Sequence, residues 1–122
     1  MDARKEEFPS TVYRVTLNAE LNPGLKVNVM SIPCRRTAKV FKTAHGKSIK
    51  QSEIMRPNSF VDRNLIMEYV YCDQEDQVSA AIDLLIARSR QKADAMLAKA
   101  MAIHEAAHSE PTIQRENWFD RH

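Results

Sequence analysis

The sequence predicts an α+β fold, in which a small curled antiparallel sheet is followed by one long C-terminal helix. Three observations lead to this prediction. Short segments between residues 10 and 72 alternate between apolar and polar side chains, which is typical of strands. Tight-turn signals separate those segments, and beyond residue 73 the apolar spacing changes to that of a helix. A chain of 122 residues provides for one domain.

The composition indicates an ordinary globular protein rather than a disordered or membrane one, since 43% of residues are hydrophobic and 28% are charged. No apolar run approaches the roughly 18–20 residues that span a bilayer. The first seven residues lack the apolar segment of a secretory signal, so we expect a cytoplasmic protein. Cys34 and Cys72 form no C-x-x-C pair, and we expect both to be reduced thiols.

Charge is unevenly distributed along the chain. Residues 20–63 contain nine basic and three acidic side chains, a net charge of +6, whereas residues 64–122 contain six basic and ten acidic ones, a net charge of −4. The sequence thus joins a basic module to an acidic helical one. This asymmetry suggests an anionic partner for the first module, or two modules that neutralise each other across a surface.

The N-terminal part begins with a mobile tail, residues 1–9. The alternation of residues 10–20 predicts a first strand, which Asn22-Pro23-Gly24 ends in a turn. Residues 26–30 alternate again and predict a second, short strand. We expect Ile32-Pro33 to interrupt it, because proline cannot donate a hydrogen bond to a ladder.

The clearest hairpin follows, with residues 37–43 as one strand, His45-Gly46 as the turn and residues 47–50 as the return strand. Residues 51–55 fit a single helical turn. Residues 64–72 form the most apolar segment, and because both of its faces are apolar we expect a central strand with the helix packed over one side.

Four or five short strands followed by one helix are typical of a small curled sheet or an SH3-like barrel. Residues 37–57, Thr-Ala-Lys-Val-Phe-Lys-Thr-Ala-His-Gly-Lys-Ser-Ile-Lys-Gln-Ser-Glu-Ile-Met-Arg-Pro, resemble hairpins of small bacteriophage-encoded proteins with such a barrel. The resemblance covers about a sixth of the chain and includes no catalytic residue. It implies a phage origin and a barrel, and no activity.

One continuous helix is predicted over residues 73–110, with Asp73 as N-cap, Glu75 and Asp76 at the positive end of the dipole, and Pro111 as the limit. Its apolar stripe consists of Val78, Ile82, Leu85, Ile86, Ala93, Met96, Leu97, Ala100, Ile103 and Ala107. Ser89 and Lys92 interrupt the stripe, so a bend near Ser89 is the alternative to a straight helix.

The predicted helix is too long for the sheet to cover its whole apolar stripe. A helix of about 37 residues is about 55 Å long, whereas the sheet domain is about 25–30 Å across. The second half would therefore overhang with its apolar face in water, which usually marks an interface. We expect a homodimer, and the alternative is a second half that folds back onto the sheet. The predicted dimer interface consists of Met96, Leu97, Ala100, Ile103, His104 and Ala107.

His104-Glu105-Ala106-Ala107-His108 matches the H-E-x-x-H signature and resembles the zincin metalloprotease helix, in which two histidines hold zinc and the glutamate acts as general base. A catalytic zinc needs a third protein ligand, and the zincin extension that provides it is absent after His108. We therefore expect no catalytic residue, no metal and no cofactor. A zinc site at His104 and His108 is the alternative.

Two further segments are candidates for binding. The basic hairpin, residues 35–50, combines cations with an aromatic ring, as in an electrostatic groove with a stacking platform; it also fits an edge hairpin protected by lysines. Its candidate residues are Arg35, Arg36, Lys39, Phe41, Lys42, Lys47 and Lys50. In the tail, residues 111–122, Trp118 and Phe119 would either anchor a partner or dock back onto their own domain or onto the dimer mate.

The sequence therefore predicts a non-enzymatic, homodimeric regulatory or inhibitor protein that binds a macromolecule, either a protein or a nucleic acid. Binding of a nucleic-acid backbone by the basic hairpin is one alternative, and a small zinc-dependent hydrolase is the other. We expect no membrane partner and no small-molecule substrate.

Overall fold

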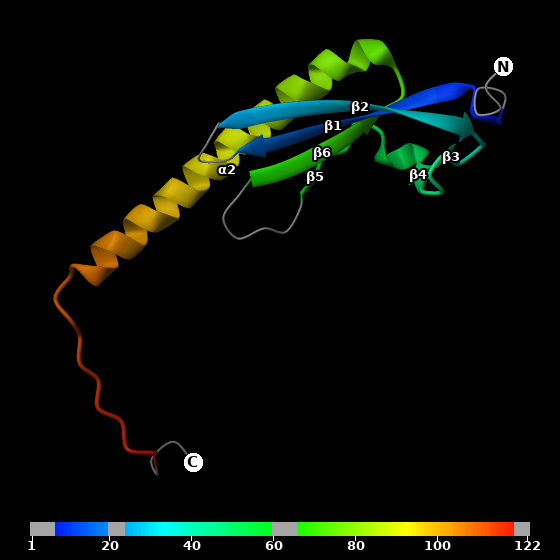
Figure 1. Ribbon diagram of the computed structural model, residues 1–122. Helices are drawn as coiled ribbons and strands as arrows, with labels where there is room; N and C mark the ends of the chain where they lie inside the picture. Colours follow the sequence, from blue (N-terminus) through cyan, green and yellow to red (C-terminus); the bar gives the residue numbers. More distant parts are fainter. Residues whose placement is uncertain (1–6, 20–23, 60–65, 119–122) are drawn as a thin grey trace.

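The computed structural model describes residues 7–19, 24–59 and 66–118 (Figure 1). Within these ranges, six strands form one antiparallel sheet in the order β4-β3-β2-β1-β6-β5, and a long helix follows. The strands are β1 (Ser10–Ala19), β2 (Leu25–Arg36), β3 (Val40–Thr43), β4 (Ser48–Lys50), β5 (Asn58–Ser59) and β6 (Ile66–Cys72). The helical segments are η1 (Gln51–Glu53), η2 (Glu75–Gln77) and α2 (Val78–Ala107). The predicted α+β fold is confirmed.

Strand β2 is longer than predicted, and the expected interruption at Ile32-Pro33 is wrong. Pro33 lies opposite Thr11 of β1, and its carbonyl oxygen accepts a hydrogen bond from the amide of Ala44, 2.9 Å away. The amide and carbonyl of one strand residue face the same neighbour. The N–H that proline lacks is therefore missing on the β3 side, and the ladder between β2 and β1 is unaffected.

The hairpin is shorter than predicted. Strand β3 begins at Val40 instead of residue 37, because Thr37 forms a local turn in which its amide donates to the Val40 carbonyl at 2.8 Å and its hydroxyl contacts the same residue. The His45-Gly46 turn is confirmed, with Gly46 at a φ of 89°. The helical turn after β4 is confirmed as η1. The predicted turn at residues 22–23 and the first two residues of the predicted strand 64–72 lie outside the described residues.

The sheet curls because the chain after η1 returns to β6. Ile54 forms a parallel bridge with Tyr71, and the amide of Met55 donates to the Tyr71 carbonyl at 2.7 Å. This contact closes one end of the sheet into a half-barrel around a buried cluster. The cluster comprises Val12, Ile32, Cys34, Phe41, Ile49 and Tyr71.

A second buried cluster lies on the other face of the sheet, where the first half of α2 packs against β1 and β6 (Figure 1). It comprises Val15, Leu17, Val70, Cys72, Ala81 and Leu85. The helix thus covers one side of β6, as predicted. Strand β6 is less central than predicted, because its outer neighbour β5 has only two residues.

Helix α2 starts later than predicted and is continuous. The expected cap at Asp73 is wrong, because Gln74 and Gln77 form a reciprocal capping box around η2, which precedes the helix. The Gln77 side-chain oxygen accepts the amide of Asp73 at 3.3 Å. Helix α2 then runs without interruption through Ser89 to Ala107, and its second half is exposed, so the alternative of a second half that folds back onto the sheet is wrong. No helix in the described ranges is long and apolar enough to cross a membrane.

The two cysteines lie on opposite faces of the sheet, one in each buried cluster. Both are free thiols. Burial, with a smaller contribution from the charge of Asp73, raises the pKa of Cys34 and of Cys72 above the ordinary thiol value. Both side chains are therefore protonated at neutral pH.

Candidate binding surfaces

The second half of α2, residues 93–107, is exposed along its whole length and projects beyond the sheet (Figure 1). Ser89, Met96 and Ile103 are seven residues apart, so the stripe that packs on the sheet continues past it on the same side of the helix. Met96, Leu97 and Ile103 are 50–61% exposed. All six predicted interface residues (Met96, Leu97, Ala100, Ile103, His104 and Ala107) therefore lie on the overhang.

The H-E-x-x-H residues occupy the last turn of α2. The rings of His104 and His108 stack with their centroids 4.2 Å apart, and Nδ1 of His108 donates to the His104 carbonyl at 2.9 Å. Only Nε2 of His108 is thus available to a metal. Within the described residues, no group of three or more His, Cys, Asp or Glu side chains could hold a metal ion. The zinc hydrolase stays an alternative prediction.

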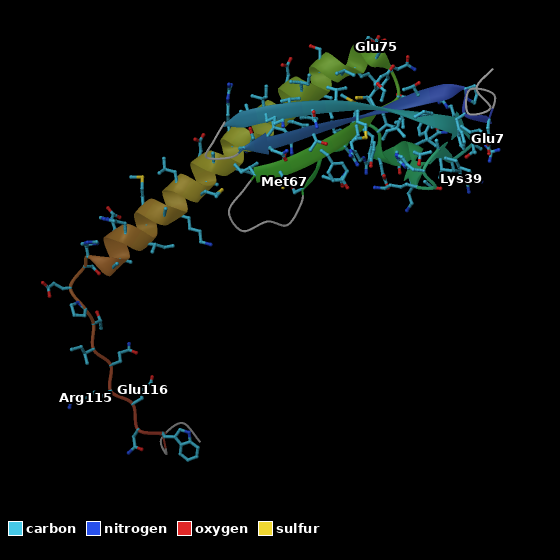
Figure 2. The ribbon with its side chains drawn as sticks, viewed as in Figure 1. Glu7, Lys39, Met67, Glu75, Arg115 and Glu116 are labelled. Atoms are coloured by element: carbon cyan, nitrogen blue, oxygen red, sulfur yellow. The ribbon has the colours of Figure 1, made fainter. Side chains whose placement is uncertain are left out.

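The structure divides the predicted basic hairpin between the two faces of the sheet. Arg35 and Lys42 are cross-strand neighbours on the face that carries α2. Lys50 lies on that same face, because its partner Val40 is two residues from Lys42 along β3, and Lys39 directly precedes β3, where Figure 2 labels it. Arg36 and Lys47 belong to the opposite face. A single ligand on this hairpin therefore cannot contact all six cations.

Phe41 is 2% exposed and cannot act as a stacking platform, which corrects its predicted role. It belongs to the cluster inside the half-barrel. The guanidinium of Arg36 lies 5.6 Å from the centre of its ring and covers it. Phe41 thus supports the fold, and any aromatic contact with a ligand must come from another residue.

Tyr69 carries a half-buried aromatic ring on a surface that the sequence reasoning missed. On the sheet face away from α2, Arg14 lies opposite Met30 and Tyr71, Thr16 opposite Asn28 and Tyr69, and Asn18 opposite Lys26 and Met67. These side chains are half-buried or exposed, except for Tyr71. We call the surface of Arg14, Thr16, Asn18, Lys26, Asn28, Met30, Met67 and Tyr69 the open sheet face. It begins where the closed end of the sheet stops, and Figure 2 labels Met67 on it.

Lys47 borders the open sheet face and is fixed there by Tyr71. Its Nζ donates a hydrogen bond to the Tyr71 hydroxyl at 3.1 Å. This bond raises the pKa of Lys47 above its ordinary value, against a smaller opposing influence of the charge of Arg14. The edge of the Tyr69 ring meets Tyr71 at an interplanar angle of 82° with centroids 5.6 Å apart. Two cations and a half-buried aromatic ring are therefore brought together from β1, the β3–β4 turn and β6.

The sequence reasoning also missed the buried carboxylate of Glu68. It is fully buried on the helix side of β6, where it forms ion pairs with Arg88 and Lys92. Burial disfavours its charged form, but the hydrogen bonds from Lys92 and Arg88 outweigh this and lower the pKa of Glu68. The signal was present in the sequence as one acidic residue inside an apolar strand. The cluster anchors α2 at the point where the helix leaves the sheet.

The tail leaves the protein in an extended form. Residues 110–118 are exposed, and Figure 1 shows them running away from the sheet. Trp118 is 66% exposed. The described part of the tail does not dock onto its own sheet, which corrects that alternative, and docking onto a dimer mate stays a prediction. Phe119 lies outside the described residues, and the anchor role of the pair stays a prediction.

Comparisons with known proteins complete the description of these surfaces. A scan against family models, a search of curated proteins and a search of solved structures each returned no match to this chain.

Proposed function

We propose that the protein is a non-enzymatic, homodimeric binding protein, a small regulator or inhibitor that occupies the surface of a macromolecular partner. The observation that carries the proposal is the overhang of α2, whose apolar stripe continues in phase with the half that packs on the sheet. A second copy is the simplest cover for such a stripe, because an identical helix presents the same self-complementary face.

The expected strength of this dimer follows from the exposed side chains. Burying the accessible part of Met96, Leu97 or Ile103 stabilises by about 1–1.5 kcal/mol each. Two copies contribute six such side chains, or about 6–9 kcal/mol, against an association cost of about 4–15 kcal/mol. The two quantities are comparable. We therefore expect a dimer that dissociates on dilution rather than an obligate one.

Small residues favour the pairing. Ala93, Ala100 and Ala107 recur every seven residues beside the positions of Met96 and Ile103, and alanine allows two helices to approach closely. A regulator or inhibitor of this kind acts by covering part of its partner's surface. When α2 pairs with α2, the other exposed surfaces of each copy stay accessible to such a partner. Pairing would present two sheets for binding, which increases avidity for a repetitive target.

Sedimentation equilibrium over a range of concentrations tests the proposal. The chain should move from 14.0 kDa towards twice that mass as its concentration rises. Ile103→Glu, in the middle of the exposed stripe, should keep the protein monomeric. Ala98→Glu places the same charge on the other side of the helix and should leave the dimer intact. A wild-type protein that stays at 14.0 kDa throughout would refute the dimer.

A further inference from the structure

We propose that the open sheet face is a binding site for single-stranded nucleic acid, with Arg14 and Lys47 contacting phosphates and Tyr69 stacking on a base. This inference rests on the proposed binding function and names the class of its partner. It uses a different surface from the predicted basic hairpin, of which only Lys47 takes part.

The charge of the sheet selects an anionic partner. The six described strands carry six cations, Arg14, Lys26, Arg35, Arg36, Lys42 and Lys50, and a single carboxylate, Glu68. Glu68 is buried on the opposite face and already pairs with Arg88 and Lys92. The described strand residues of the open sheet face therefore include cations and no carboxylate. Such a surface attracts phosphates even though the net charge of the whole chain is only +2.

The neutral residues of the face favour a single strand over a duplex. Tyr69 offers an aromatic ring, and its cross-strand neighbours Thr16 and Asn58 are polar groups that can meet base edges. A duplex presents its backbone and, in its grooves, the edges of its bases, but it hides the flat faces of the bases, so no base of a duplex can stack on the Tyr69 ring. A single strand can use the ring, the polar groups and the cations together.

The geometry also matches an extended chain. Residues of one face recur at about 6.7 Å along a strand, so that Arg14, Thr16 and Asn18 mark successive steps along β1. Lys47 and Arg14 lie at one end of this path and Lys26 at the other. A backbone laid along β1 therefore meets a cation at both ends and Tyr69 beside its centre. An acidic peptide would satisfy the cations but leave the aromatic ring without a flat partner.

Fluorescence anisotropy with a labelled oligo(dT) and a labelled oligo(U) of about 20 nucleotides, longer than the 4–16 nucleotides that one small domain typically covers, tests the site. Both probes should bind, and a duplex of the same length should bind more weakly. Arg14→Glu should weaken binding about tenfold and reduce the salt dependence by about one phosphate. Tyr69→Ala should weaken it by about tenfold, and Tyr69→Phe, which keeps the ring, should restore it.

The matched control is Arg35→Glu, which reverses an exposed cation on the opposite face of the sheet and should change affinity no more than about twofold, as expected for a screened, distant charge. Circular dichroism confirms that each variant is folded. Three results would each overturn the site. They are an equal loss of affinity in Arg14→Glu and Arg35→Glu, an unchanged affinity in Tyr69→Ala, and no binding of either probe. Competition by polyglutamate as strong as that by unlabelled oligo(dT) would also overturn it, in favour of an acidic protein partner. Sedimentation of the same samples reports on the dimer separately.

Discussion

The two halves of α2 carry one apolar stripe, yet their surroundings differ completely. In the first half Ala81, Leu85 and Ser89 are at most 4% exposed, whereas in the second half Met96, Leu97 and Ile103 are at least half exposed. The sheet ends between them, at the ion pair of Lys92 with Glu68. Periodicity thus identifies which side of a helix is apolar, and the extent of the neighbouring element decides how much of that side is covered.

The largest difference in unfolding free energy between the two halves is expected from a matched pair of leucine truncations. Leu85→Ala should lower the free energy of unfolding by about 2–5 kcal/mol, because it removes a fully buried side chain and leaves a cavity. Leu97→Ala should lower it by less than about 0.5 kcal/mol for the monomer, because that side chain is 61% exposed. Urea denaturation of dilute protein measures both. Similar losses for the two variants would show that the second half is covered within one chain.

The junction between the halves depends on Glu68. Glu68→Gln should cost about 1–2 kcal/mol of unfolding free energy, because it removes a buried charge that two cations satisfy. The loss is smaller than for a fully buried pair, since the Arg88 and Lys92 side chains are 37% and 40% exposed. Asp83→Asn, at an exposed position of α2, is the control and should change stability by less than about 0.5 kcal/mol.

The same carboxylate gives a pH dependence. Because the pKa of Glu68 is lowered in the folded state, its contribution to stability is complete above the unfolded pKa of about 4.3 and is lost as the pH falls through the folded pKa. Denaturation midpoints of the wild-type protein should therefore fall on acidification below about pH 4.3. The denaturation midpoint of Glu68→Gln should fall less over the same pH interval. Parallel curves for the two proteins would remove Glu68 from the explanation.

The smallest expected losses of stability come from replacing exposed alanines of the two halves of α2 by glycine. Ala87→Gly and Ala98→Gly each weaken a helix locally by about 1 kcal/mol. In the first half this cost should appear in global unfolding, because the helix there is packed on the sheet. In the second half it should appear only as faster amide exchange and lower helicity in dilute protein, since residues 93–107 are all exposed. Equal global losses would mean that the two halves unfold as one unit.

Much of the fold could be predicted because it depends on local patterns. The alternation in Ser10–Ala19, the His45-Gly46 turn and the helical period of Val78–Ala107 all reflect which faces are apolar. The errors arose where the outcome depends on hydrogen bonds of backbone groups, which the apolar pattern of the sequence does not indicate. Proline was expected to end β2, but its missing N–H falls outside the β1 ladder, and Gln77 replaced Asp73 in capping because its side chain reaches back to two amides.

The candidate sites were less predictable, because they depend on strand register. Arg14 and Tyr69 are 55 positions apart in the sequence, and only the pairing of β1 with both β2 and β6 places them on one face. Glu68 and Lys92 meet because α2 packs over β6, a contact that likewise no local pattern in the sequence indicates. Conversely, the basic hairpin is contiguous in sequence, but the alternation of its strands sends neighbouring cations to opposite faces.

The two buried thiols make the protein convenient to measure. Cys34 and Cys72 are sealed in separate clusters and held in the protonated form, in which a thiol reacts slowly with labelling reagents. A cysteine introduced at exposed Ala102 would therefore be the one fast-reacting thiol of the chain, without removal of the native pair. A spin label attached there would report the distance between two α2 helices directly. The native thiols would not interfere, because they would stay unlabelled.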